Sequence, residues 1–268
     1  MASISKQFVA GCALVLVARG ELGLDDPVSR HLAAAGSEWD GANVGQLLTH
    51  SSGMSHWGDR AGFAPPAPTP SAERLRLFLA APRSGAGEFR YSSPGYVVLS
   101  AVLAAVAGRS YEHVARELVL EPLGLTATSL GSPGTVPVAR GYRAGEPVPS
   151  WDLGSMPGTG DVWSTVADLA RFVTALHTGE LLPPAVQPLL HDVRVPYADP
   201  GDSRVRASAY AVGHFVGTID GRPACLHPGD NPGYQSLAAW LPDSATTVVV
   251  LSNDEADDIE SVVADAPR

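Results

Sequence analysis

The sequence has 268 residues, of which 45% are hydrophobic and 17% charged, so it can bury a sizeable core and is not an intrinsically disordered chain. Its formal net charge of −10 and the lack of any basic run argue against binding to nucleic acid or to an anionic lipid surface. The length fits one large domain or two small ones, and we expect a single catalytic domain over residues 1–268.

The larger, N-terminal part of the chain is predicted to be mainly helical. Residues 3–19 read as a buried helix, because the run from Phe8 to Ala18 is apolar. Further helices are expected at residues 28–35, 44–51, 73–80, 95–107, 111–119 and 164–177, with turn-rich or irregular connections at 58–70, 83–95 and 130–162. Ser164 or Thr165 provides an N-cap for the last of these helices.

The character of the sequence changes after Pro196, where four segments predict β-strands. They are residues 207–218, 222–227, 234–241 and 246–253, separated by turn residues. Helices that come first and antiparallel strands that come last favour an α+β fold. We expect a helical region over about 20–195, packed with the N-terminal helix on a mainly antiparallel sheet over about 205–268.

The N-terminal segment resembles a short signal peptide, since a positive charge precedes an apolar run. The apolar stretch before Cys12 is shorter than the ~7–15 residues that a signal peptide needs, and the whole run to Ala18 is shorter than the ~20 residues that span a bilayer. We therefore expect a buried helix, no membrane span and a cytoplasmic protein, with a signal peptide as the alternative. An extension upstream of Met1 could carry a secretion signal.

Cysteine and histidine spacing gives no indication of a metal site or a cofactor. Cys12 and Cys225 lack the CxxC spacing of zinc sites, although a single disulfide between them is open, and the eight histidines form no HxxxH or HExxH pair. Cys225 lies two residues before His227 and would share its face of a strand. That permits a Cys–His nucleophile, but no third, orienting residue is suggested.

The single lysine is the most informative residue in the composition. The chain has 17 Arg and one Lys, Lys6, and only a Lys amine can lose its proton and act as a base. Lys6 closes the sequence Ser3-Ile4-Ser5-Lys6, in which positions one helical turn apart bring the Ser3 hydroxyl and the amine together. Apolar surroundings would lower the pKa of Lys6 and let it take the Ser3 proton. The alternative is that one Lys remains by chance.

Two further groups of residues could carry chemistry. Tyr91-Ser92-Ser93 lies in a turn before an apolar helix, where the Tyr91 hydroxyl could relay a proton or could only anchor the loop. His227-Pro228-Gly229 closes a predicted strand, and a glycine there lets a ligand approach the strand closely. The alternative for His227 is an ordinary turn with a surface histidine.

Taken together, these motifs resemble the serine β-lactamase and penicillin-binding-protein superfamily, on the side of class C β-lactamases, DD-carboxypeptidases and related esterases. The resemblance runs from residue 2 to about residue 253. It is carried by the segments Ser3–Lys6, Gly20–Pro27, Leu47–Gly53, Tyr91–Tyr96, Glu121–Leu125, Ser164–Leu169 and His227–Gly229.

The resemblance implies a role for each of the matching residues. Ser3 would be the acylated nucleophile, Lys6 its general base, Tyr91 a proton shuttle, and His227 part of the strand along which the substrate lies. The backbone N–H groups of Ser3 and Asp230 would form the oxyanion hole. Ser93 and Gly229 would contact the substrate, and no cofactor is implied.

Two features depart from the family pattern. Ser93 stands where Asn is usual, so an amide that contacts acylamino substrates is missing, which leaves room for esters. Ser3 is the third residue, whereas the family has several dozen residues before the nucleophile, including two strands. If the sheet lacks those strands, an unpaired edge would be exposed to solvent or could mediate self-association.

We therefore expect a serine hydrolase that forms an acyl-enzyme on Ser3 with a small-molecule ester, amide, peptide or β-lactam-like substrate. One alternative is an acyltransferase that acts on a biosynthetic intermediate. Another is a truncated, inactive or binding member of the family.

Overall fold

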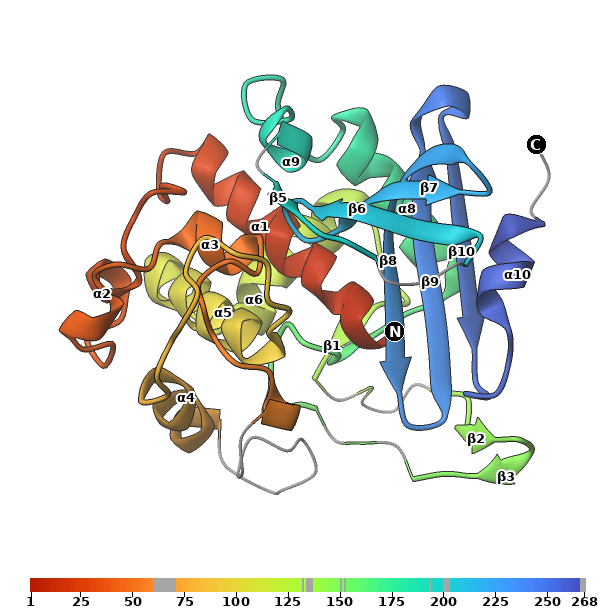
Figure 1. Ribbon diagram of the computed structural model, residues 1–268, viewed down its shortest axis with the longest axis horizontal. Helices are drawn as coiled ribbons and strands as arrows, with labels where there is room; N and C mark the ends of the chain where they lie inside the picture. The colour runs from red at the N-terminus through yellow and green to blue at the C-terminus, as the bar shows by residue number, and fades with distance from the viewer. Residues whose placement is uncertain are drawn as a thin grey trace.

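The computed structural model describes residues 1–59, 71–131, 133, 137–149, 151, 153–192, 194–199 and 203–265. Most of the loop predicted at 58–70 lies outside these residues. A helical region stands beside a six-stranded antiparallel sheet (Figure 1). The α+β architecture that the order of elements predicts is confirmed.

The helical region contains two apolar helices that lie deep in the protein. α1 is buried from Ser5 to Leu14, and α5 is buried from Ser93 to Ser100. The helices are η1 (Ala2–Ile4), α1 (Ser5–Ala18), α2 (Val28–His31), η2 (Ser37–Trp39), α3 (Val44–Leu48), η3 (Trp57–Asp59), α4 (Ser71–Leu79), α5 (Ser93–Ala107), α6 (Tyr111–Ala115), the π-helical η4 (Arg116–Leu120), α7 (Glu121–Leu123), α8 (Val166–Thr178), α9 (Leu189–Asp192) and α10 (Ile259–Ala264). The predicted cap is confirmed, since the Thr165 side chain accepts the Asp168 N–H.

The large sheet has the strand order β10-β9-β8-β7-β6-β5. Its strands are β5 (Val195–Pro196), β6 (Val205–Tyr210), β7 (Phe215–Ile219), β8 (Arg222–Asn231), β9 (Tyr234–Leu241) and β10 (Thr246–Ser252). Two short pairs, β1 (Ser129–Leu130) with β4 (Val162–Trp163) and β2 (Tyr142–Arg143) with β3 (Glu146–Pro147), interrupt the stretch predicted as irregular. The bounds of β9 are those predicted.

Two strand predictions were wrong in their extent. The segment 207–218 is a hairpin, because Gly213 takes a φ of 81° and the Ala211 N–H donates to the His214 carbonyl at 2.8 Å, which reverses the chain. β8 continues to Asn231, so His227 lies inside a strand rather than at its end. The Pro-Gly pair that suggested a turn is instead accommodated in the ladder with β9.

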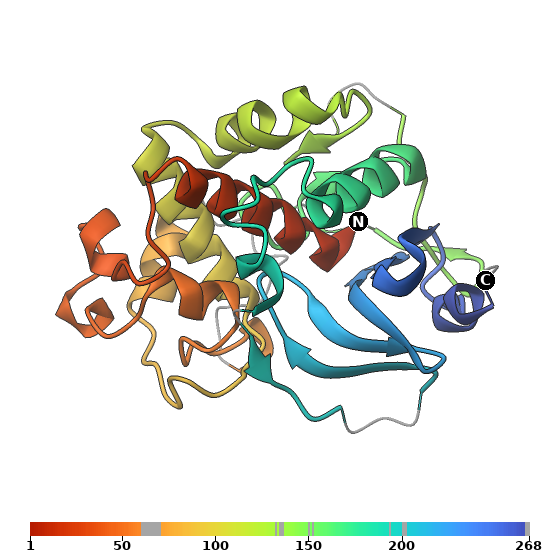
Figure 2. The ribbon, with the colours of Figure 1, turned by 90° about the horizontal axis from the view of Figure 1, so that it is seen from above.

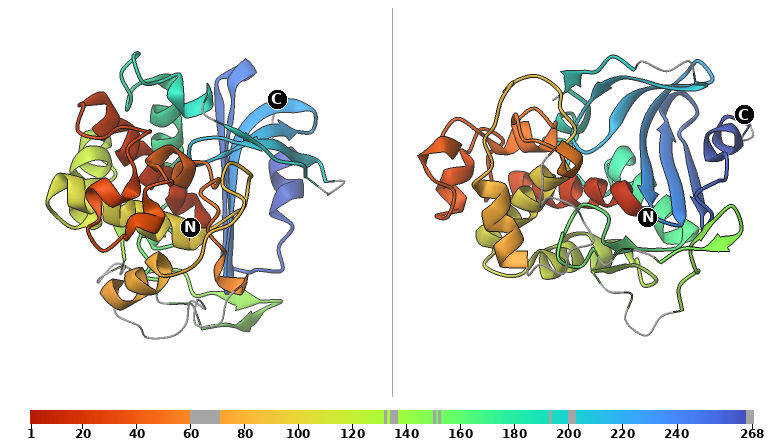
Figure 3. Two further views of the ribbon diagram at one scale, coloured as in Figure 1. Left: turned by 60° about the vertical axis from the view of Figure 1, so that its left-hand side comes forward. Right: turned by 60° about the horizontal axis from the view of Figure 1, so that its bottom comes forward.

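The sheet lies between the helical region and α10. α8 contacts β9 and β10, α10 also contacts these strands, and Figures 1 to 3 show α1 and α10 on opposite sides of the sheet. The rings of Phe8 (α1) and Phe172 (α8) stack with centroids 3.8 Å apart, which locks the two helices together. Among the described residues, no helix is both long and apolar enough to cross a bilayer.

Candidate active site

Ser3 and Lys6 meet at the point where η1 passes into α1. The Lys6 Nζ donates to the Ser3 Oγ at 3.1 Å and to the Thr159 carbonyl at 3.2 Å. Lys6 is completely buried, and this burial lowers its pKa to about 7, although the charge of Asp161 opposes the change. A substantial fraction of the amine is therefore neutral at pH 7 and able to accept the Ser3 proton.

Asp161 is a buried acid that the sequence analysis did not single out. Its Oδ1 accepts the Gly158 N–H at 2.8 Å, and burial raises its pKa to about 7, against the nearby charges of Lys6 and the amine of Met1. The carboxyl and the Lys6 amine thus influence each other's protonation. A hint of this role in the sequence is that Asp161 is an acidic residue after Gly158-Thr159-Gly160, inside the segment expected to be irregular.

Tyr91 brings a third polar group to Ser3 and Lys6. Its ring centroid lies 4.9 Å from the Lys6 Nζ. Burial raises the pKa of the Tyr91 hydroxyl, and the neighbouring Ser3 and Ser93 hydroxyls oppose this rise only in part. Tyr91 is therefore protonated at neutral pH, and its proton is available only to a strongly basic group such as a departing alkoxide. The Ser93 Oγ is buried and has no well-aligned hydrogen-bond partner among the described residues.

Two histidines hold the loop that carries Tyr91. The Ser92 N–H donates to the His50 Nδ1 at 3.1 Å, and the Ser93 N–H donates to the His56 Nδ1 at 3.2 Å. The His50 ring also lies 4.3 Å from the Tyr91 ring, centroid to centroid. Neither histidine was among the residues predicted from the sequence to act in the site, although His50 lies within a segment that carries the family resemblance.

His227 lies beside Tyr91, with ring centroids 6.3 Å apart. Both of its nitrogens are engaged, since the Nδ1 lies 2.6 Å from the Pro228 carbonyl and the Nε2 lies 3.1 Å from the Tyr210 hydroxyl. The pKa of His227 is lowered to about 3, mainly by burial and to a smaller extent by the charge of Lys6. This neutral imidazole lines the site and bonds to neither Ser3 nor Lys6 in the hydrogen bonds of the described residues.

Gly229 lets the N-terminal segment approach β8. A Cβ at this position would lie 2.4 Å from the Met1 carbonyl oxygen and 2.4 Å from the Ser236 Oγ. The segment that approaches Gly229 is therefore the N-terminal segment of the protein itself, and η1 lies against β8 (Figure 1). Ala2, directly before Ser3, has a strained φ of 50°. Asp230 follows Gly229, with an exposed side chain and its backbone in register with Gln235.

A cavity of about 610 Å³ opens next to this group of residues. Its lining includes Met1, Asp161, Trp163, Asn231 and Tyr234. Ser3, Lys6, Tyr91 and His227 do not line it. The structure therefore brings these four predicted residues together in one place, outside the lining of this cavity.

Two curated proteins illustrate what this chain is similar to in sequence. Esterase EstB of Burkholderia gladioli is 35% identical over 167 residues, which cover 56% of this chain and 42% of the esterase. Penicillin-binding protein 4 of Amycolatopsis lactamdurans is 26% identical over 284 residues, which cover 94% of this chain and 71% of that protein. As with the esterase, this chain spans only about half of the length of several other curated relatives, from 43% to 61%.

A solved structure shows the same fold. The D-amino acid amidase from Ochrobactrum anthropi SV3, complexed with D-phenylalanine, superposes with a TM-score of 0.83 at 25% identity and covers 98% of this chain and 88% of the amidase. The Beta-lactamase family model matches residues 1–266. The fold, the match along the chain and the relatives agree, and this chain belongs to the Beta-lactamase family.

Proposed function

We propose that this chain is a serine hydrolase that forms an acyl-enzyme on Ser3 with ester or amide substrates. The observation that carries the proposal is the 3.1 Å contact between the Ser3 Oγ and the Nζ of a completely buried Lys6. A desolvated lysine beside a hydroxyl is suited to act as its general base. The contact joins the only lysine of the chain to a serine at the start of a helix.

In acylation, the neutral Lys6 amine takes the Ser3 proton while the Ser3 Oγ attacks the carbonyl carbon of the substrate. The backbone N–H groups of Ser3 and Asp230 receive the oxyanion. When the tetrahedral intermediate collapses, Tyr91 donates its proton to the departing alcohol or amine and regains one from Lys6. Water then releases the acid by the same steps in reverse, so protons and atoms balance.

The remaining residues position these groups. His227 accepts no proton at neutral pH, because its pKa is low and both nitrogens are engaged, so it orients Tyr210 and forms a wall beside Tyr91. His50 and His56 fix the backbone of Ser92 and Ser93. Gly229 allows η1, which carries Ser3, to lie against β8, which carries Asp230.

The relatives and Ser93 support a proposal for the substrate class. The relatives include an esterase, a penicillin-binding protein and an amidase that binds D-phenylalanine. A serine hydroxyl at position 93 has a shorter reach than an amide and offers one donor. We therefore favour small esters and simple amides over acylamino substrates such as β-lactams.

A fluorophosphonate probe tests the proposal directly. We expect one adduct per chain, located on Ser3 by peptide mass mapping, and no adduct in Ser3→Ala. Ser208→Ala is the matched control, because Ser208 is exposed on β6 and lies outside the candidate site. A folded wild-type chain that stays unlabelled, or an adduct on a different serine, contradicts the proposal.

A further inference from the structure

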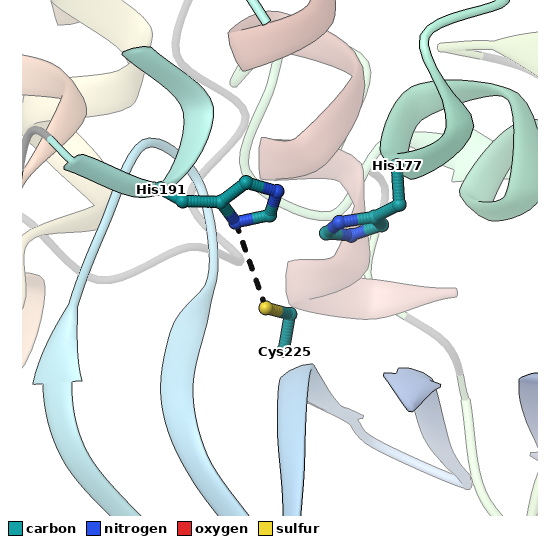
Figure 4. Close-up of side chains that lie close together, drawn as sticks. All are labelled: His177, His191 and Cys225. Atoms are coloured by element: carbon teal, nitrogen blue, oxygen red, sulfur yellow. Dashed lines mark hydrogen bonds between the residues drawn. The ribbon is translucent and has the colours of Figure 1, made fainter. Parts of the chain in front are cut away.

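A second cluster of reactive side chains lies away from Ser3. His177 in the last turn of α8, His191 in α9 and Cys225 in β8 point toward one another (Figure 4). One potential ligand atom from each side chain lies within 4.8 Å of the other two, and the His191 Nδ1 is 3.6 Å from the Cys225 Sγ. The three residues come from three separate elements, so their meeting depends on the tertiary fold.

The polar atoms of this cluster are buried and incompletely paired. Neither nitrogen of His177 has a hydrogen-bond partner among the described residues, although the side chain is buried. The His177 ring instead stacks on Trp240, with centroids 5.8 Å apart and planes 5° apart. Buried polar groups in folded proteins are nearly always satisfied, so this arrangement points to a bound group that supplies the missing partner.

His214, in the turn between β6 and β7, adds a fourth candidate ligand. Its Nδ1 lies 3.1 Å from the Val212 carbonyl, which assigns the proton to Nδ1 and leaves the lone pair on Nε2. This Nε2 is buried and has no hydrogen-bond partner among the described residues. The His214 ring centroid lies 5.3 Å from that of His177 and 5.4 Å from that of His191.

Two of these distances match the geometry of a tetrahedral metal centre. Bond lengths of ~2.3 Å to sulfur and ~2.0–2.1 Å to nitrogen place neighbouring S and N ligands about 3.6 Å apart. The same geometry places the centroids of two imidazoles on one ion about 5.2 Å apart. The His191–Cys225 contact of 3.6 Å and the centroid spacing of 5.2 Å between His177 and His191 agree with both values.

We propose that His177, His191 and Cys225 bind one zinc-like divalent cation, with the His214 Nε2 moving in as the fourth ligand. One sulfur and three nitrogens form a donor set that suits Zn²⁺ and contains none of the oxygen ligands that Mg²⁺ and Ca²⁺ prefer. Binding releases the thiol proton of Cys225, and nothing is oxidised or reduced. The ion would join α8, α9, β8 and the β6–β7 turn, and would stabilise the strand that carries His227.

Co²⁺ and Zn²⁺ titrations of the full-length, chelator-treated protein test this site. We expect one Zn²⁺ per chain, measured by competition with a chromophoric chelator and unaffected by excess Mg²⁺. Co²⁺ should give the visible absorption of a tetrahedral centre together with a thiolate-to-cobalt charge-transfer band. Zn²⁺ should also raise the thermal unfolding midpoint, since it binds the folded state.

Variants assign the ligands. His177 packs against Trp240, so its removal perturbs the core, and we use Cys225→Ala and the half-buried His191→Ala instead. Each should weaken Zn²⁺ binding at least about 10-fold, and Cys225→Ala should abolish the charge-transfer band. The matched controls are Cys12→Ala, at the other free cysteine, and His113→Ala, at an exposed histidine on α6.

His214→Ala should weaken binding less than Cys225→Ala, because a water can replace its nitrogen. The proposal is overturned if the folded chain binds no Zn²⁺ near one equivalent. It is also overturned if Cys225→Ala and His191→Ala keep both the affinity and the Co²⁺ spectrum of the wild type.

Discussion

Lys6 shows how one buried side chain sets the chemistry that we propose. The amine is desolvated, yet it keeps hydrogen-bond contacts with Ser3 and Thr159, so its pKa falls to about 7 without the group being orphaned. An arginine at the same position keeps its charge and cannot act as a base.

Lys6→Arg therefore separates charge from basicity. We expect the acylation rate of Ser3 to fall about 10²–10⁴-fold, the usual contribution of a general base, while circular dichroism shows a folded chain. The measurement is the rate of adduct formation with an activated ester. Turnover close to that of the wild type would remove Lys6 from the mechanism.

The pH dependence of acylation follows from the same group. The neutral amine is the active form, so the rate should rise with pH through an apparent midpoint of about 7. The charge of Asp161 raises the pKa of Lys6, so Asp161→Asn should move this midpoint to lower pH. Asp243→Asn, at an exposed position, is the control. A midpoint that Asp161→Asn leaves in place would show that the two groups are not coupled.

Ser93 tests substrate preference. Ser93→Asn restores the amide that is usual in the family, and one good hydrogen bond in a dry site contributes about 1–3 kcal/mol, or roughly 5- to 150-fold. We expect the ratio of kcat/KM for acylamino, peptide-like substrates to kcat/KM for simple esters to rise within that range. Ser93→Ala serves as the control for loss of the hydroxyl. An unchanged ratio in the Asn variant would show that position 93 does not determine specificity.

At the scale of elements, the contact between η1 and β8 decides where Ser3 lies. Gly229→Ala would place a Cβ 2.4 Å from the Met1 carbonyl oxygen, where backbone rather than a flexible side chain must move. We expect a loss of about 1–3 kcal/mol in the free energy of unfolding, measured in urea, together with slower Ser3 labelling. Gly41→Ala, which meets nothing within 4 Å, is the matched control and should change neither quantity.

At the scale of the whole molecule, β10 forms one edge of the large sheet. Its only partner in that six-stranded sheet, as far as the described residues show, is β9. Unpaired edges are common sites of association, so we expect a mass above that of one chain in light scattering as the concentration rises. A single-chain mass over the whole concentration range would rule out association through this edge.

Local geometry explains why part of the fold and of the site could be predicted from the sequence. Residues one helical turn apart must lie close, so the spacing alone is enough to pair Ser3 with Lys6. Helices followed by alternating strands indicate the α+β class, and the turn residues around β9 bound it correctly. The hairpin at Gly213 was missed because alternation alone does not reveal where a strand reverses.

Residues that are far apart in the sequence could be assigned to one site only from the folded protein. Asp161 reaches Lys6 from an irregular segment, and His50 and His56 reach the Tyr91 loop from a different part of the helical region. His191 and Cys225 meet across 34 positions, with no spacing motif to indicate the contact. The physical reason is that burial and packing create these contacts and shift the pKa values. Neither these contacts nor the pKa shifts can be deduced from a few neighbouring residues in the sequence.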